Sequence, residues 1–138
     1  MTDRLIGIDF GLSKVGLSIS DPLKIISIPL KVVKYKKREE LLSELQEIAM
    51  ENDVKSFVIG YPLNMNNRKN EMTKLVDDFY EELKNLNFNV FLQDERLSSE
   101  SAKKIMHEQN IKTGKNKEHI DLIASTIILQ SFLDKGSF

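Results

Sequence analysis

A short apolar segment between two amphipathic stretches constrains the fold more than any other feature of this sequence. The segment SFVIG at residues 56–60 is almost wholly apolar, which fits a buried central strand. Helical spacing precedes it from Arg38 to Glu51, and a second helical stripe that includes Val76 and Leu83 follows it. Because strands joined through helices run parallel as crossovers, this pattern predicts a parallel part of a sheet with helices packed on it.

The N-terminal part adds antiparallel strands to this sheet. Strands are expected at Leu5–Phe10 and Val15–Ser20, joined by the short turn Gly11–Lys14. A third extended run, from Ile25 to Val33, contains Pro29, which favours a sheet edge or a bend.

The C-terminal part completes the fold. A strand is expected from Asn89 to Gln93, a helix capped by Ser98 that runs through Asn110, and a last helix from Glu118 to Asp134. The order β-β-β-α-β-α-β-α-α predicts a three-layer α/β fold, with a five-stranded mixed sheet and helices on both faces. No repeat or low-complexity linker interrupts the chain, so we expect a single domain over residues 1–138.

Composition narrows the functional classes. With 0 Cys the chain has no disulfide framework and no thiolate metal site, which suits a reducing cytosol. The N-terminus lacks a signal-peptide layout and no apolar run approaches membrane-spanning length, so we expect a soluble cytoplasmic protein. At a net charge of -1, nucleic-acid binding would need local basic patches or a metal ion. Basic residues cluster at 31–38 and 112–117, although a solvated surface explains either cluster equally well.

A carboxylate stands inside the first strand signal. Alternation places Gly7 and Asp9 on one face, beside Gly16 and Ser18 of the partner strand. Such small side chains would leave space around Asp9 for ions and a phosphodiester. A plainer explanation is that Asp9 ends the strand and caps the turn.

Two further acidic positions attract attention. Asp121 lies in the first turns of a helix that is apolar almost all round, where a buried carboxylate needs a partner, a proton or a metal. The helix dipole alone would also favour an acid there. Asp94 and Glu95 follow a strand at the edge where ligand sites of α/β sheets gather, and only one of two adjacent acids can point into a shared site. Hard oxygen ligands with only 2 His suit Mg²⁺ or Mn²⁺, which can drive phosphodiester hydrolysis.

Four sequence blocks resemble, in order and spacing, the signature blocks of the YqgF/RuvX family. They are DFGLSKVGLSISD, VIGYPLNMN, LQDERLSS and HIDLIASTIILQSFL, and the match runs from about Ile6 to Leu133. These small proteins are described as Holliday junction resolvases and as pre-16S rRNA processing nucleases. The resemblance implies an RNase H-like fold, metal-dependent endonuclease activity, and processing of the 5′ end of pre-16S rRNA in ribosome biogenesis.

The resemblance also implies roles for individual residues. Asp9, Glu95 and Asp121 would be the catalytic acids and would bind Mg²⁺ or Mn²⁺, with Asp94 as a substitute for Glu95. The residues implied in substrate binding are Lys14, Asn64, Arg96 and Lys115. In the usual strand order of this fold, Glu95 would start roughly 10 Å from the first strand, a gap that its long side chain and bridging metals would close.

The chain departs from the family pattern at three places. Ser13-Lys14 stands where the family usually has Lys-Arg, and Asn67 stands where it often has Gly. Lys112 or Lys115 replaces the arginine that is common before the last helix. Lysine keeps the charge but loses the bidentate phosphate contact.

Other functions compete with rRNA processing. Holliday junction resolution would favour a homodimer, because two symmetric cuts need two sites. A non-catalytic RNA- or ribosome-binding factor would keep the fold without metal binding. An ATP-using protein is a weaker candidate, because that fold clamps nucleotide between two such domains. We therefore expect a monomer or homodimer that acts on nucleic acid, with pre-rRNA favoured over branched DNA and no membrane partner.

Overall fold

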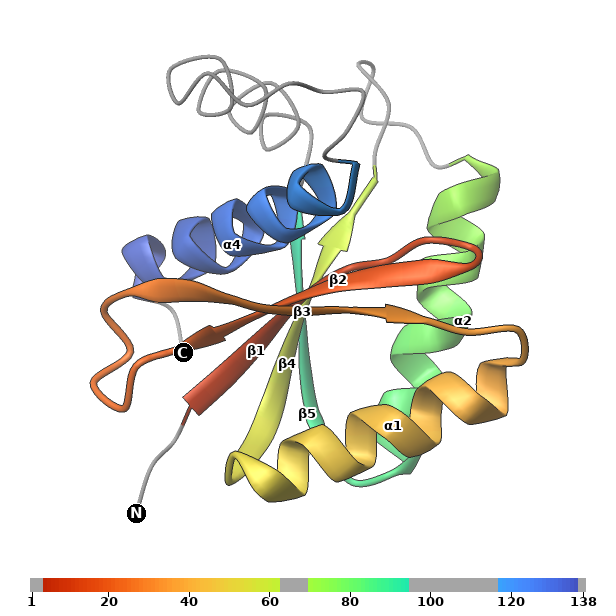
Figure 1. Cartoon of the computed structure of the whole chain (residues 1–138), viewed down its shortest axis with the longest axis horizontal. Helices are drawn as coiled ribbons and strands as arrows, with labels where there is room; N and C mark the ends of the chain where they lie inside the picture. Colours follow the sequence, from red (N-terminus) through yellow and green to blue (C-terminus); the bar gives the residue numbers. More distant parts are fainter. Residues whose placement is uncertain (1–3, 63–69, 95–116, 137–138) are drawn as a thin grey trace.

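The structure is built around a five-stranded mixed sheet (Figure 1). The computed structural model describes residues 4–62, 70–94 and 117–136. The strands are β1 (Arg4–Asp9), β2 (Lys14–Ser20), β3 (Ser27–Lys34), β4 (Val54–Tyr61) and β5 (Asn89–Asp94). Their order is β3-β2-β1-β4-β5, with β1–β2 and β2–β3 antiparallel and β1–β4 and β4–β5 parallel. The predicted mixed sheet is confirmed, and Pro29 lies on an edge strand as expected.

Helices cover both faces of this sheet. In the described residues, α1 (Arg38–Glu51) and α2 (Glu71–Asn85) lie on one face and α4 (Lys117–Lys135) lies on the other (Figure 1). α1 has the predicted bounds. α2 begins at a capping box, in which Asn70 Oδ1 accepts from Thr73 N at 3.1 Å and Thr73 Oγ1 accepts from Asn70 N at 2.7 Å. The helix expected from Ser98 to Asn110 lies outside the described residues.

The sheet divides the hydrophobic core into two clusters. The cluster on the side of α1 and α2 includes the fully buried Ile6, Ile8, Leu17, Leu41, Leu45, Phe57 and Phe79. The cluster under α4 consists of Leu5, Val58, Ile128, Leu129, Phe132 and Leu133. Because side chains alternate along a strand, Gly7 and Asp9 share the face of Leu5 and therefore point towards α4.

α4 packs directly on the backbone of β1 and β2. A Cβ atom at Gly16 would lie 2.4 Å from the backbone oxygen of Asp121, and one at Gly7 would lie 2.7 Å from Leu129 Cβ. The expectation that the small residues leave room for ions and a phosphodiester was therefore wrong for these positions. The space above Gly7 and Gly16 is filled by the helix, since only glycine allows so close an approach.

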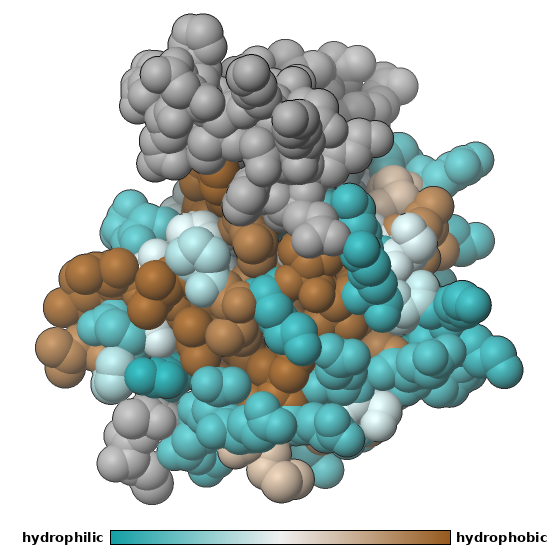
Figure 2. All heavy atoms as spheres, in the orientation of Figure 1, coloured by the Kyte–Doolittle hydropathy of each residue, from teal (hydrophilic) through white to brown (hydrophobic). Residues whose placement is uncertain are grey.

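The third strand begins two residues later than predicted, because a side chain organises the preceding turn. The carboxylate of Asp21 accepts hydrogen bonds from the backbone N–H groups of Leu23, Ile25 and Ile26, at 3.2, 2.7 and 2.8 Å. The turn leaves these three side chains 76%, 59% and 58% exposed. Figure 2 shows the apolar surface at this β2–β3 connection, on the left of the view.

Candidate functional site

Two of the predicted catalytic acids lie against the same glycine. Asp9 is the last residue of β1, and its Cα is the register partner of Gly16 in β2. The backbone of Asp121 lies over Gly16 from the helix side, and both carboxylate residues are half-buried. The fold thus brings together Asp9 and Asp121, which come from opposite ends of the chain, at the carboxyl end of β1.

A lysine of the neighbouring strand contacts the helix acid. Lys14 Nζ lies 3.0 Å from Asp121 Oδ2, and the two side chains are 33% and 24% exposed. The two groups form an ion pair, so the buried oxygen Oδ2 has the ammonium of Lys14 as its partner. Lys14, which was predicted to bind substrate, therefore lies directly beside a predicted metal ligand.

Serine hydroxyls hold the helix in this position. Ser125, one turn after Asp121, donates from Oγ to the carbonyl oxygen of Gly7 at 2.9 Å. Ser18 Oγ donates to the carbonyl oxygen of Ser125 at 2.8 Å. Both serines are fully buried. These hydrogen bonds link β1, β2 and α4, so they fix Asp121 relative to Asp9.

The site contains a polar residue that sequence reasoning missed. Ile8 of β1 is the register partner of Ile59 in β4, so the next residue, Gly60, lies beside Asp9. Gly60 in turn pairs with Gln93 of β5. Gln93 therefore lies in the same row across the sheet as Asp9, two strands away and on the α4 face. It is only 6% exposed, and its buried Oε1 atom has no hydrogen-bond partner in the described part of the chain. The signal in the sequence was a polar amide within an otherwise apolar strand, next to more conspicuous acids.

Asp94 faces the other side of the sheet. It pairs with Tyr61, whose side chain packs against the core cluster on the side of α1 and α2. The Tyr61 hydroxyl donates to Asp77 of α2 at 3.0 Å, which confirms this direction. Asp94 is thus separated from Asp9 by the sheet, so it is poorly placed to share a metal ion with Asp9.

The other predicted site residues are not among the described ones. Glu95, Asn64, Arg96 and Lys115 all lie outside them. Within residues 4–62, 70–94 and 117–136, no group of three or more His, Cys, Asp or Glu side chains is arranged to hold a metal ion. The described part therefore supplies two acids of the predicted three.

The two acids nevertheless fit a divalent cation. Their carboxylate oxygens are hard donors of the kind that Mg²⁺ and Mn²⁺ prefer. Asp121 Oδ2 is buried and is already paired with the ammonium of Lys14. A buried carboxylate oxygen favours a nearby positive charge, and the ion pair shows that this position accepts one.

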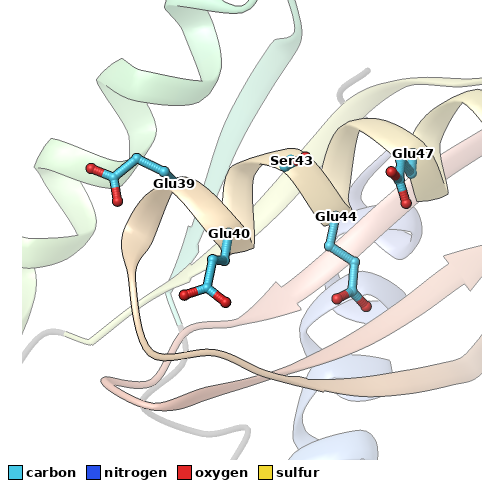
Figure 3. A pocket seen from close by; sticks show the side chains of 5 residues that line it. All are labelled: Glu39, Glu40, Ser43, Glu44 and Glu47. Atoms are coloured by element: carbon cyan, nitrogen blue, oxygen red, sulfur yellow. The ribbon is translucent and has the colours of Figure 1, made fainter.

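A second group of acids lies away from this site. Glu39, Glu40, Ser43, Glu44 and Glu47 line a shallow hollow of about 450 Å³ on α1 (Figure 3). Their carboxylates are spread along the helix instead of meeting at one point, and Glu44 forms an ion pair with Lys31 at 3.1 Å. Because α1 and α4 cover opposite faces of the sheet, this hollow is no part of the candidate site.

The helices of the described part carry no membrane span. None of them combines the length and the apolar character that crossing a bilayer requires.

Solved structures share the fold at low sequence identity. The chain matches RuvC of T. thermophilus in complex with a Holliday junction substrate (TM-score 0.53, 16% identity, 98% of this chain and 96% of that one). It also matches the Fowlpox virus resolvase bound to Holliday junction DNA (TM-score 0.57, 12% identity, 98% and 99%). A third match is the large terminase nuclease of phage G20c with bound zinc (TM-score 0.57, 14% identity, 94% and 80%). The RNase H-like fold class is confirmed.

Curated relatives are much closer in sequence. A protein of Ruminiclostridium cellulolyticum named "Putative pre-16S rRNA nuclease" is 38% identical over 134 residues, which cover 96% of this chain and 94% of the relative. A relative of the same name from Mycoplasmopsis synoviae is 39% identical over 133 residues, covering 95% and 97%. The family model described as RuvX: Holliday junction resolvase matches residues 3–135. The chain therefore belongs to the RuvX family.

Proposed function

We propose that residues 1–138 form a single RNase H-like domain that hydrolyses phosphodiester bonds in structured nucleic acid in the cytoplasm. The observation that carries this proposal is the meeting of Asp9 and Asp121 over Gly16. Two half-buried carboxylates that lie near one another repel each other and favour bound cations, and Lys14 already supplies one positive charge to Asp121. A metal-dependent hydrolase would use the two carboxylates to bind its cation.

We assign Glu95 as the third acid. Gln93 faces α4 and Asp94 faces α2, so an extended chain would turn the next side chain towards the face of Asp9. Asp9, Glu95 and Asp121 would then hold Mg²⁺ or Mn²⁺. When bound, such ions activate water and stabilise the leaving oxygen of a phosphodiester.

The basic and amide side chains would bind the substrate. Lys14 pairs with Asp121 in the absence of substrate, and its ammonium would shift to a phosphate oxygen when the strand binds. Arg96 would contact phosphate as a bidentate donor, while Asn64 and Lys115 would contact the adjacent backbone. These side chains orient the strand, and the two carboxylates mark the position of the reacting phosphate.

The preferred substrate is pre-16S rRNA, because the relatives from Ruminiclostridium cellulolyticum and Mycoplasmopsis synoviae are named for it. The family resemblance implies its 5′ region as the place of cleavage. Branched DNA is the second candidate, because the family description and two structural neighbours name the Holliday junction. Resolution of a junction would require a homodimer, whereas rRNA processing is compatible with a monomer.

The test compares an acid of the site with an acid outside it. Asp9→Asn should lower Mg²⁺- or Mn²⁺-dependent cleavage at least about a hundredfold, because a metal ligand supplies several kcal/mol of transition-state stabilisation. Asp78→Asn, the same change at an exposed position of α2, should cleave like the wild type. Both are assayed on a pre-16S 5′ RNA and on a four-way DNA junction, which separates the two substrates. Undiminished cleavage by pure Asp9→Asn protein would contradict the proposal, and a wild type that binds RNA without cutting it would indicate a non-catalytic factor.

A further inference from the structure

A lysine-lined cleft opens next to the candidate site. It has a volume of about 760 Å³, and its walls come from the turn before β2, the end of β3 and the start of α1. The lining residues are Ser13, Lys14, Lys34, Tyr35, Lys36 and Glu40. The lining thus contains three lysines and one glutamate, an excess of basic residues that favours anions.

The cleft is held in shape by the chain around it. Tyr35 N donates to the carbonyl oxygen of Ser13 at 2.9 Å, and the Tyr35 hydroxyl donates to the carbonyl oxygen of Gly11. These two bonds fix the end of β3 against the turn before β2. A cleft whose walls are tied together in this way loses little conformational entropy when a ligand enters it.

Two of the lysines are direct cross-strand neighbours. Lys14 and Lys34 are register partners in β2 and β3, so their side chains leave the sheet on the same face. The two lysines concentrate positive charge on the face of the sheet that carries the candidate site. Lys14 also contacts Asp121, so the cleft and the candidate site share one wall.

We propose that this cleft binds the phosphodiester backbone of the nucleic-acid strand next to the phosphate that is cleaved, through Lys34 and Lys36. The inference rests on the proposed function, because it takes the strand to pass Asp9 and Asp121. Lysine recognises phosphate as a point charge and reads no base, so the contact is independent of sequence. The cleft thus sets the path of the strand through the site.

The chain provides a matched control on the same strand. Lys31 pairs with the core residue Leu17, faces α1 and forms an ion pair with Glu44. Lys31→Gln and Lys34→Gln therefore remove the same charge from β3, on opposite faces of the sheet. Lys34→Arg keeps the charge in the cleft.

The experiment measures binding of a labelled pre-16S 5′ RNA over a series of salt concentrations, in an Asp9→Asn background that prevents cleavage. Each lysine that neutralises a phosphate contributes about one unit to the slope of log K against log[salt]. Lys34→Gln and Lys36→Gln should each lower the slope by about one, while Lys31→Gln and Lys34→Arg should leave it unchanged. Equal losses for Lys31→Gln and Lys34→Gln, or none for either, would overturn the proposal.

Cleavage by proteins with an intact Asp9 separates this inference from the proposed function. If the wild type cleaves and Lys34→Gln keeps its salt slope, only the cleft assignment fails. If the lysines alter the slope but the wild type does not cleave in Mg²⁺ or Mn²⁺, the cleft stands as a binding site and the nuclease proposal fails.

Discussion

Among the described residues, two buried side-chain oxygens near the candidate site have no hydrogen bond. Asp121 Oδ2 is paired with the ammonium of Lys14, whereas Gln93 Oε1 has neither kind of partner there. Unpaired amide oxygens such as Gln93 Oε1 cost about 1–3 kcal/mol each. Folded proteins contain few of them, and each one calls for a physical reason. Both oxygens lie on the face of the sheet that Asp9 occupies, where a bound cation would add to the charge of Lys14 and a substrate would offer Gln93 a partner.

Gln93 offers a way to test whether stability is sacrificed at this site. Gln93→Met replaces the unpaired amide with an apolar side chain of similar length, so the free energy of unfolding in metal-free buffer should rise by about 1 kcal/mol. Cleavage should fall about tenfold or more, as is typical when a polar group near a metal site is removed. Urea denaturation and a cleavage assay on the same preparation measure the two effects.

The control for this change is another glutamine. Gln130 accepts from Ser27 N and donates to the carbonyl oxygen of Ile25, both at 2.9 Å. Gln130→Met should therefore lower the free energy of unfolding by about 1 kcal/mol, with cleavage unchanged. A loss of stability in Gln93→Met as large as that in Gln130→Met would show that the Gln93 amide is an ordinary structural group.

Asp21 gives a pH-dependent prediction. The hydrogen bonds from Ile26, Ile25 and Leu23 favour its ionised form and lower the pKa of this carboxyl from 3.8. Because the pKa is lower in the folded state, the stabilisation is present above pH 3.8 and disappears as the pH falls through the folded pKa. Asp21→Ala should melt at a lower temperature than the wild type at pH 7, and the difference should shrink below pH 3.8. A difference in melting temperature that is constant from pH 7 to pH 2 would contradict this.

The contact between α4 and β2 depends on one glycine. Gly16→Ala would place a methyl group 2.4 Å from the backbone oxygen of Asp121, and backbone atoms cannot move aside as a flexible side chain can. We expect a loss of about 1–3 kcal/mol in the free energy of unfolding, as for an overpacked core, together with a loss of cleavage because α4 shifts Asp121. Thermal melts and cleavage assays measure both.

Gly136→Ala is the control for Gly16→Ala, because it introduces backbone strain without a steric clash. Gly136 has a φ of 66° and nothing within 4 Å of an added Cβ atom, so the substitution adds only the cost of a left-handed backbone, about 1 kcal/mol. It lies at the far end of α4 and should leave cleavage intact. If Gly16→Ala behaves like Gly136→Ala in both assays, α4 is not held by close contact at Gly16.

Local sequence patterns predicted the helices and strands well, but they predicted the contacts between these elements poorly. The helix at Arg38–Glu51 was predicted with its observed bounds, because its apolar stripe repeats at helical spacing and the chain is extended on both sides. The start of β3 was placed too early, because Ile25 and Ile26 look like strand residues while the Asp21 carboxylate holds them in a turn.

The sequence predicted the candidate site only in part, because local patterns identify single residues but not the contacts between distant segments. Asp9 and Asp121 were recognisable as acids in apolar surroundings, and a resemblance to a family connected them. That the helix backbone would fill the space above Gly16 could not be read from the sequence, because it depends on how closely two distant segments approach. Gln93 was missed because its position opposite Asp9 follows from the registers of three strands.

For the whole molecule, the sheet joins acids from both ends of the chain, so a cation held by them should stabilise the entire fold. A ligand that binds only the native state adds about 1.4 kcal/mol at ten times its Kd. For a chain of this size that corresponds to roughly 4 °C per kcal/mol in melting temperature. Mn²⁺ should therefore raise the melting temperature of the wild type by several degrees, and EDTA should reverse the shift. The shift should be absent from Asp9→Asn and from Asp121→Asn.

The acidic hollow on α1 provides the control, because four glutamates could also attract a cation. Glu47→Gln removes one of these charges on the other face of the sheet, so it should keep the full Mn²⁺ shift. The opposite result, a shift that survives in Asp9→Asn and is lost in Glu47→Gln, would place the ion on α1 and would remove the physical basis for a metal site at the carboxyl end of β1. Because Asp9 and Asp121 approach each other only in the folded sheet, the predicted pattern requires the ion to bind the folded state that joins β1 and α4.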